Sequence, residues 1–88
     1  MKLDWDETKR QATLRERGLD FADAAQLDWE TAIIFDDVRQ DYGERRQVCL
    51  GRLRDGVVVV AFTFRGDALR VISMRMANRR ERKLHDDS

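Results

Sequence analysis

The 88-residue sequence contains no proline, one cysteine and one histidine. A single cysteine, Cys49, cannot form an internal disulfide, which is typical of proteins from a reducing compartment, so we expect a cytoplasmic protein. One cysteine and one histidine with scattered carboxylates do not make a transition-metal site, so we expect no metal and no cofactor. The first ten residues, MKLDWDETKR, have no apolar stretch typical of a signal peptide.

Long hydrophobic runs are missing as well. The longest one, residues 57–64, is far shorter than the roughly 20 residues that span a bilayer, so we expect no membrane association. No glycine-rich phosphate loop and no serine-nucleophile motif is present. The hydrophobic fraction of 42% is still enough for a globular core. We therefore expect one small domain, residues 1–88.

The first half of the chain has few basic residues, and the second half has few acidic ones. Residues 1–44 hold 6 Lys+Arg and 12 Asp+Glu, whereas residues 45–88 hold 11 Lys+Arg and 5 Asp+Glu. The basic half is suited to bind phosphates or an acidic partner. Alternatively, the two halves cancel by pairing with each other across the fold.

The first half of the sequence predicts two helices and a strand. Asp4 and Glu7 form a plausible capping pair for a helix that runs to about Arg17, with Gly18 as its C-cap. Asp20 is placed to cap a second short helix, residues 21–27. The string TAIIF, residues 31–35, predicts a short strand, and residues 36–44 a polar loop.

The second half predicts a three-stranded meander followed by a helix. Residues 46–53 alternate as one strand, Asp55-Gly56 marks a hairpin, residues 57–64 form a central strand, and Gly66-Asp67 turns into a strand over residues 69–76. Residues 77–85 predict a helix with a basic face. The fold class is therefore α+β, with two N-terminal helices, an antiparallel sheet of about four strands and a C-terminal helix.

Five strings in order carry a resemblance to a known family. They are LDWDETKR, RGLDFADA, DDVRQDYGERR, LGRL and LRVISMRMANRRER. Together they resemble the BrnT family of toxins, from Leu3 to about His85. The resemblance implies a RelE-like fold and an endoribonuclease toxin of a type II toxin–antitoxin system. It also implies a ribbon-helix-helix (BrnA-like) antitoxin as partner, with operator DNA bound only through that antitoxin.

Metal-independent RNA cleavage needs cations around a phosphate, because the RNA's own 2′-OH attacks the adjacent phosphorus. Arginine suits that role, since its planar fork matches a phosphate and stays charged. We predict a clamp of Arg65 with Arg75, assisted by Arg79. Strand alternation puts Val71, Ser73 and Arg75 on one face. Further candidates for binding RNA phosphates are Arg17, Arg52, Arg70 and Arg80. The alternative for each of these residues is that it is an ordinary arginine at the edge of the sheet and does not bind a phosphate.

Proton-transfer groups are few. His85 is the one imidazole, and Glu44 and Glu81 could act as bases if burial raised their pKa values. Tyr42 could hydrogen-bond a phosphate or stack on a base. The structural alternatives are that His85 lies on the surface, that Tyr42 packs the loop, and that Glu81 pairs with an arginine of its own helix.

The sequence departs from the family pattern at two places. Glu16-Arg17-Gly18 stands where the family commonly has Lys-His-Gly, and Met76 stands where it commonly has lysine. A catalytically weak or inactive BrnT-like module that acts through its antitoxin as a co-repressor is therefore an alternative function. A second alternative is a domain that binds RNA phosphates without cutting.

The large apolar residues are expected to build the core. Trp5, Trp29 and Phe35 lie next to the ends of predicted elements, where aromatic residues usually close a small core. The even-numbered residues of the central strand should form its centre, and these are Val58, Val60, Phe62 and Phe64. Cys49 is expected to be a small buried side chain.

Overall fold

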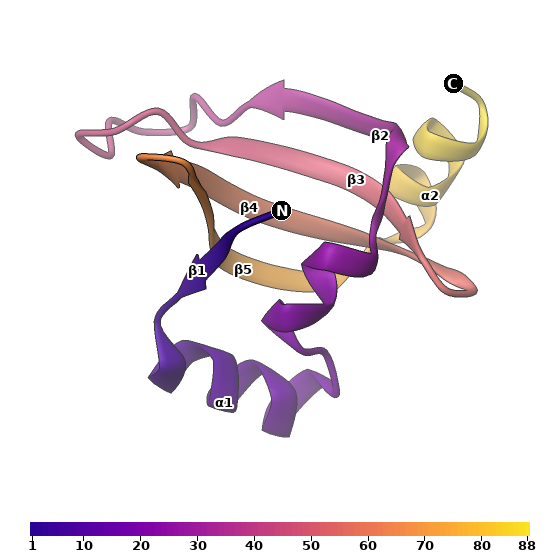
Figure 1. Cartoon of the computed structure of the whole chain (residues 1–88). Coiled ribbons are helices and arrows are strands. Elements are labelled where there is room, and N and C mark those ends of the chain that lie inside the picture. Colours follow the sequence, from indigo (N-terminus) through magenta and orange to yellow (C-terminus); the bar gives the residue numbers. More distant parts are fainter.

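The computed structural model describes all residues, 1–88. Its elements in chain order are β1 (Leu3–Trp5), α1 (Glu7–Arg17), the 3₁₀ helix η1 (Phe21–Gln26), β2 (Asp28–Asp36), β3 (Gln47–Leu53), β4 (Gly56–Arg65), β5 (Ala68–Met76) and α2 (Arg79–Asp86). Figure 1 shows α1 and η1 on one side of the sheet and α2 on the other. Neither α-helix is long and apolar enough to cross a membrane.

The sheet is mixed and has five strands in the order β1-β5-β4-β3-β2. β1 pairs parallel with β5, and the other neighbours are antiparallel. The expected architecture of two N-terminal helices and about four antiparallel strands is therefore wrong. One α-helix lies between β1 and β2, and the segment after Asp20 forms a 3₁₀ helix.

The additional strand, β1, comes from residues expected to begin the first helix. The carboxylate of Asp4 accepts a hydrogen bond from Arg70 Nη1 at 2.6 Å, so Asp4 is held at the sheet. The helix begins after Asp6 instead, whose side chain accepts from the backbone N–H of Lys9. Its end is as predicted, because Gly18 adopts a φ of +69° and donates its N–H to Leu14.

The meander of β3, β4 and β5 is confirmed to within about one residue at each strand end. The first hairpin turns at Arg54 and Asp55, one residue earlier than predicted, because Leu53 pairs with Gly56. The second turns at Gly66 and Asp67 as predicted, with Gly66 at a φ of +62°. Alternation and turn residues are local signals, which explains why this part of the chain is predictable.

The two faces of the sheet carry separate apolar clusters. The face toward η1, which we call the α1 face, holds the larger cluster of 11 buried residues, including Cys49, Phe62 and Met74. The opposite face, the α2 face, holds a cluster of four: Leu50, Val57, Val59 and Ala77. The burial of Cys49 confirms its predicted place and raises the pKa of its thiol to about 12.

Two predicted core aromatics are not in the core. Phe35 is 45% exposed and Phe64 is 59% exposed. Both lie near strand ends that no helix covers. Strand alternation indicates on which face a side chain lies, but it does not indicate how much of that side chain is buried. Val58, Val60 and Phe62 are buried as predicted.

Candidate functional site

A β-bulge in β5 decides which side chains share the α2 face. Along β4, Ala61 lies opposite Ser73 while the next residue, Phe62, lies opposite Val71, so Ile72 is the extra residue. Val71 therefore belongs to the core of the α1 face, apart from Ser73 and Arg75. The prediction that these three share a face is wrong for Val71 and right for Ser73 and Arg75. The bulge also brings Arg70 to the α2 face, opposite Thr63.

The α2 face contains a groove of about 320 Å³ between the β2–β3 loop and the start of α2. The apolar residues that line it are Phe35, Val38, Val48, Val59 and Ala61. The polar ones are Asp36, Asp37, Arg39, Ser73, Arg75 and Glu81. A groove that combines an apolar wall with guanidinium groups can accept a ligand that is partly apolar and partly anionic.

Arg75 and Glu81 form a two-bond ion pair in this groove. Nη1 and Nη2 of Arg75 donate to Oε1 and Oε2 of Glu81, both at 2.8 Å. Glu81 also accepts from the backbone N–H of Asn78 at 2.9 Å as part of a capping box. These bonds, that from Arg75 first, lower the pKa of Glu81 to about 2. Glu81 is therefore ionised and a poor proton acceptor near neutral pH, and its role is to fix the guanidinium.

The other wall of the groove carries a second arginine that the sequence did not single out. Nε and Nη2 of Arg39 donate to the carboxylate of Asp37 at 2.9 and 2.8 Å, and the hydroxyl of Tyr42 donates to it at 3.1 Å. The Asp37 side chain is only 3% exposed, and these hydrogen bonds, that from Arg39 first, hold its pKa below the usual range. The hydrogen bonds to Glu81 raise the pKa of Arg75. The positive charge of Arg39 opposes that shift, because the two guanidinium groups repel each other across the groove. Arg39 lies in the string DDVRQDYGERR, which was a signal that could have found it.

A second cluster of charges adjoins the loop wall of the groove, at the end of the face away from α2, and we call it the basic end. Glu44 accepts from Arg46 at 3.1 Å and lies 3.6 Å from Arg65, while Arg70 pairs with Asp4. The guanidinium of Arg46 lies 4.1 Å from the centre of the Tyr42 ring. Glu44, Arg65 and Arg70 are thus brought together, with Arg46 as a member that the sequence did not indicate.

The structure does not bring Arg65 to Arg75. Arg75 lies opposite Val59 and Arg65 is six residues further along β4, a separation of about 20 Å. Each guanidinium is also held by its own carboxylate. Arg65 and Arg75 are therefore not brought together in this arrangement, and the clamp stays a prediction.

His85 lies outside the groove, at the far end of α2. Its side chain is buried, with Nδ1 3.2 Å from Oδ1 of Asp86, which also pairs with Arg52 at 3.2 Å. Nε2 of His85 has no hydrogen-bond partner. His85 is thus buried and not on the surface. Neither Arg52 nor His85 lies in the groove or in the basic end.

The remaining predicted phosphate ligands are exposed. Arg79 and Arg80 begin α2 next to the groove and make no ion pair, so they are free to meet an anion. Arg17 reaches from α1 to the backbone carbonyl of Met74, to which its Nη1 donates at 2.9 Å. Met76 is half exposed.

The charge asymmetry of the sequence is partly cancelled across the fold. Six of the twelve ion pairs join the acidic half to the basic half, among them Arg70 with Asp4 and Arg54 with Asp23. The alternative of mutual neutralisation therefore holds for Arg45, Arg46, Arg54, Arg65 and Arg70, whereas Arg52 and Arg75 pair within the basic half. It does not hold for Arg79 and Arg80.

Comparison with known proteins gives one match. Residues 5–81 match the sequence model of a family described as the ribonuclease toxin BrnT of a type II toxin–antitoxin system. A search of curated proteins and a search of solved structures give no match. The matched range includes both walls of the groove, from Phe35 to Glu81.

Proposed function

The chain belongs to the BrnT family of ribonuclease toxins of type II toxin–antitoxin systems, and on that premise we propose that the groove on the α2 face cleaves RNA. The reaction is an internal transesterification. The 2′-oxygen forms a bond to the adjacent phosphorus, the bond from phosphorus to the 5′-oxygen breaks, and the products are a 2′,3′-cyclic phosphate and a 5′-hydroxyl. The proton leaves the 2′-OH to water, and the 5′-oxygen gains one from water.

The observation that carries this proposal is the Arg75–Glu81 pair at the edge of the groove. The transition state gathers negative charge on the phosphate oxygens, and a prepositioned guanidinium stabilises that charge without reorganising. Glu81 fixes Arg75 from one side with two bonds of 2.8 Å, which leaves the remaining N–H groups of the fork for the phosphate. Arg39 supplies a second charge from the opposite wall.

We propose that the reaction is independent of metal. No three His, Cys, Asp or Glu side chains come together to hold an ion. The two carboxylates nearest the arginines, Asp37 and Glu81, are already occupied by guanidinium groups. Charge stabilisation by arginine then has the role that a Lewis-acidic ion has in metal-dependent nucleases.

The basic end and α2 extend the same surface for flanking nucleotides. Along the sheet, Arg70 lies about 13 Å and Arg65 about 20 Å from Arg75, so these two and the neighbouring Arg46 meet phosphates that flank the cleaved one. Arg79 and Arg80 adjoin the groove on the other side. These contacts position the RNA and carry no sequence information.

The partner is an antitoxin protein, and we propose that it is of the ribbon-helix-helix kind and covers the α2 face. A protein seated there excludes RNA from Arg75 and neutralises the free cations of α2. Operator DNA is then bound only through the antitoxin. Addition of a ribbon-helix-helix antitoxin should suppress RNA cleavage at a fixed stoichiometry, while the chain alone should leave operator DNA unshifted in a native gel.

The direct test is incubation of the purified chain with mixed cellular RNA in EDTA, followed by a denaturing gel. Arg75→Ala is compared with Arg15→Ala, which removes one exposed charge from α1 on the other side of the sheet. We expect fragments from the parent and from Arg15→Ala, and intact RNA from Arg75→Ala. Intact RNA with all three folded proteins would overturn the proposal and favour the non-catalytic co-repressor.

A further inference from the structure

We propose that the groove also binds a nucleobase, which stacks on Phe35 and is flanked by Val38, next to the phosphate at Arg75. This inference rests on the proposed function, because it concerns the same groove and the same RNA. It adds that the substrate is single-stranded RNA held by an unpaired base as well as by its phosphates.

The exposure of two apolar side chains is the first observation. Phe35 lies on the α2 face opposite Val48 and is 45% exposed, while Val38 in the adjoining loop is 84% exposed. Both line the groove together with Arg39 and Arg75. An aromatic ring left open to water beside guanidinium groups matches the surfaces that bind single-stranded nucleic acid.

The shape and division of the groove are the second observation. Its volume of about 320 Å³ is at the lower end of small-molecule sites, which suits one nucleotide rather than a helix of a partner protein. Val48, Val59 and Ala61 add apolar surface. The charged lining consists of two arginines, Arg39 and Arg75, and of three carboxylates that are each paired with an arginine, Asp36, Asp37 and Glu81. A nucleotide has the same division, with an apolar ring at one end and an anion at the other.

The groove's hydrogen-bonding groups are largely occupied by one another. Asp36 is bonded to Arg45, Asp37 to Arg39 and Tyr42, and Glu81 to Arg75. Few groups remain to read the edge of a base, so the base is held by stacking, which tolerates all four bases. The groove therefore selects unpaired RNA over duplex RNA, in which the bases are stacked on each other.

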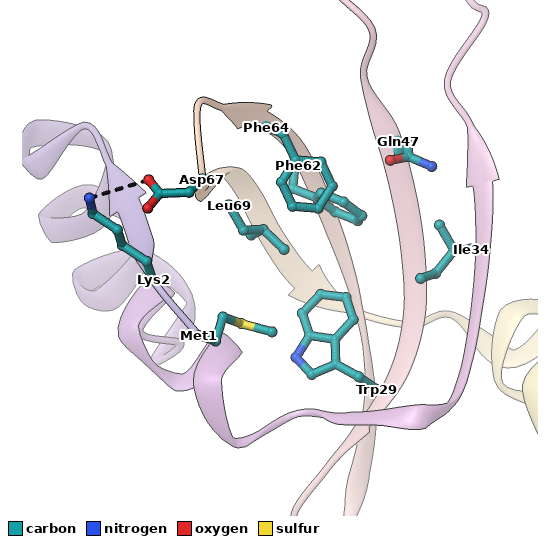
Figure 2. A pocket seen from close by; sticks show the side chains of 9 residues that line it. All are labelled: Met1, Lys2, Trp29, Ile34, Gln47, Phe62, Phe64, Asp67 and Leu69. Carbon is teal, nitrogen blue, oxygen red and sulfur yellow. Dashed lines mark hydrogen bonds and ion pairs between the residues drawn. The ribbon is translucent and has the colours of Figure 1, made fainter.

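The chain offers a matched control on the opposite face. Phe64 is 59% exposed and stacks edge-on against Phe62, with ring centres 5.8 Å apart. Figure 2 shows it at an apolar pocket of the α1 face with Trp29, Ile34 and Leu69, beside the ion pair of Lys2 with Asp67. No arginine lines this pocket, so Phe64→Ala removes a comparable aromatic surface without touching the RNA groove.

The test measures binding of two five-unit probes at one salt concentration. One is a 2′-fluoro RNA oligonucleotide, which lacks the attacking hydroxyl and stays intact, and the other is an abasic chain of the same length and charge. We expect wild type and Phe64→Ala to bind the RNA probe at least about fivefold more tightly than the abasic chain. Phe35→Ala should lose that preference, and Phe35→Tyr should keep it.

Equal binding of both probes by wild type, or an unchanged preference in Phe35→Ala, would overturn the base site. Cleavage of natural RNA by wild type, measured in parallel, separates this result from the proposed function. A wild type that cleaves but ignores the base contradicts only the stacking on Phe35. A wild type that prefers the base but does not cleave contradicts only the nuclease.

Discussion

The α1 face and the α2 face of the sheet differ in what covers them. On the α1 face, Phe21 and Ala24 of η1, with Leu27 directly after it, close over the larger cluster of buried residues. On the α2 face, the eight residues of α2 cover one end alone, and the charged groove and the basic end lie beside it. One face of this small protein therefore supplies most of the core, and the other presents the arginines.

The bulge at Ile72 is what keeps the two roles apart along β5. Before the bulge, Val71 packs into the core of the α1 face, and after it Ser73 and Arg75 point into the groove. Without the extra residue, a strict period of two would place Val71 and Arg75 on the same face. β5 thus contributes side chains both to the core and to the groove.

The largest effect on stability is expected from the α1 face. Phe62→Ala removes a ring that is 2% exposed and stacks edge-on against Trp29. The free energy of unfolding should fall by about 3–5 kcal/mol in urea denaturation. A loss below about 1 kcal/mol would show that this face is not the main core.

The contact between η1 and the sheet gives the next effect. A Cβ on Gly51 would clash with the side chain of Leu27, the residue that follows η1, so Gly51→Ala displaces that side chain from β3. We expect a loss of about 1–3 kcal/mol in the free energy of unfolding, measured by thermal denaturation. Ser73→Ala, on the exposed part of the α2 face, is the control and should change stability by less than about 0.5 kcal/mol.

The ion pair of the groove gives a smaller, pH-dependent effect. The pKa of Glu81 falls from 4.5 to about 2 on folding, so the pair stabilises the protein above about pH 4.5 and loses that contribution as the pH falls toward 2. Because Arg75 is 45% exposed, the contribution should be below about 1 kcal/mol. The difference in unfolding free energy between wild type and Glu81→Gln should be constant from pH 8 to 5 and shrink below pH 4.5. A constant difference down to pH 2 would contradict the lowered pKa.

The basic end should matter least for cleavage of the shortest substrates. Arg65→Ala should change cleavage of a dinucleotide by less than about twofold, because Arg65 lies about 20 Å from Arg75. On a long single strand it should weaken binding and reduce the salt dependence by about one phosphate contact. An equal loss on both substrates would place Arg65 at the cleaved phosphate.

Sequence patterns predicted the parts of the fold whose signals are local. Gly18 ends α1, and alternation between turn residues gives β3, β4 and β5. The sequence does not predict β1, because its three residues, Leu3–Trp5, become a strand only by pairing with β5, more than sixty positions away. No local signal records that pairing.

The site was predictable by residue type but not by position. Arg75 and Glu81 are separate candidates in the sequence and form one ion pair in the structure. Arg65 and Arg75, predicted to act together, lie far apart along the strands. A period-two pattern gives no distance along a strand and cannot locate a bulge. Arg39 was missed because its position depends on the hydrogen bonds of Asp37 and Tyr42 within a loop.

Binding of RNA to the α2 face can be observed by adding the 2′-fluoro RNA oligonucleotide to the isotopically labelled protein and following the backbone amides by NMR. We expect shifts in Phe35–Arg39, in Ser73–Arg75 and at the start of α2. Shifts confined to Phe64, Leu69 and Trp29, around the apolar pocket of the α1 face, would contradict this expectation.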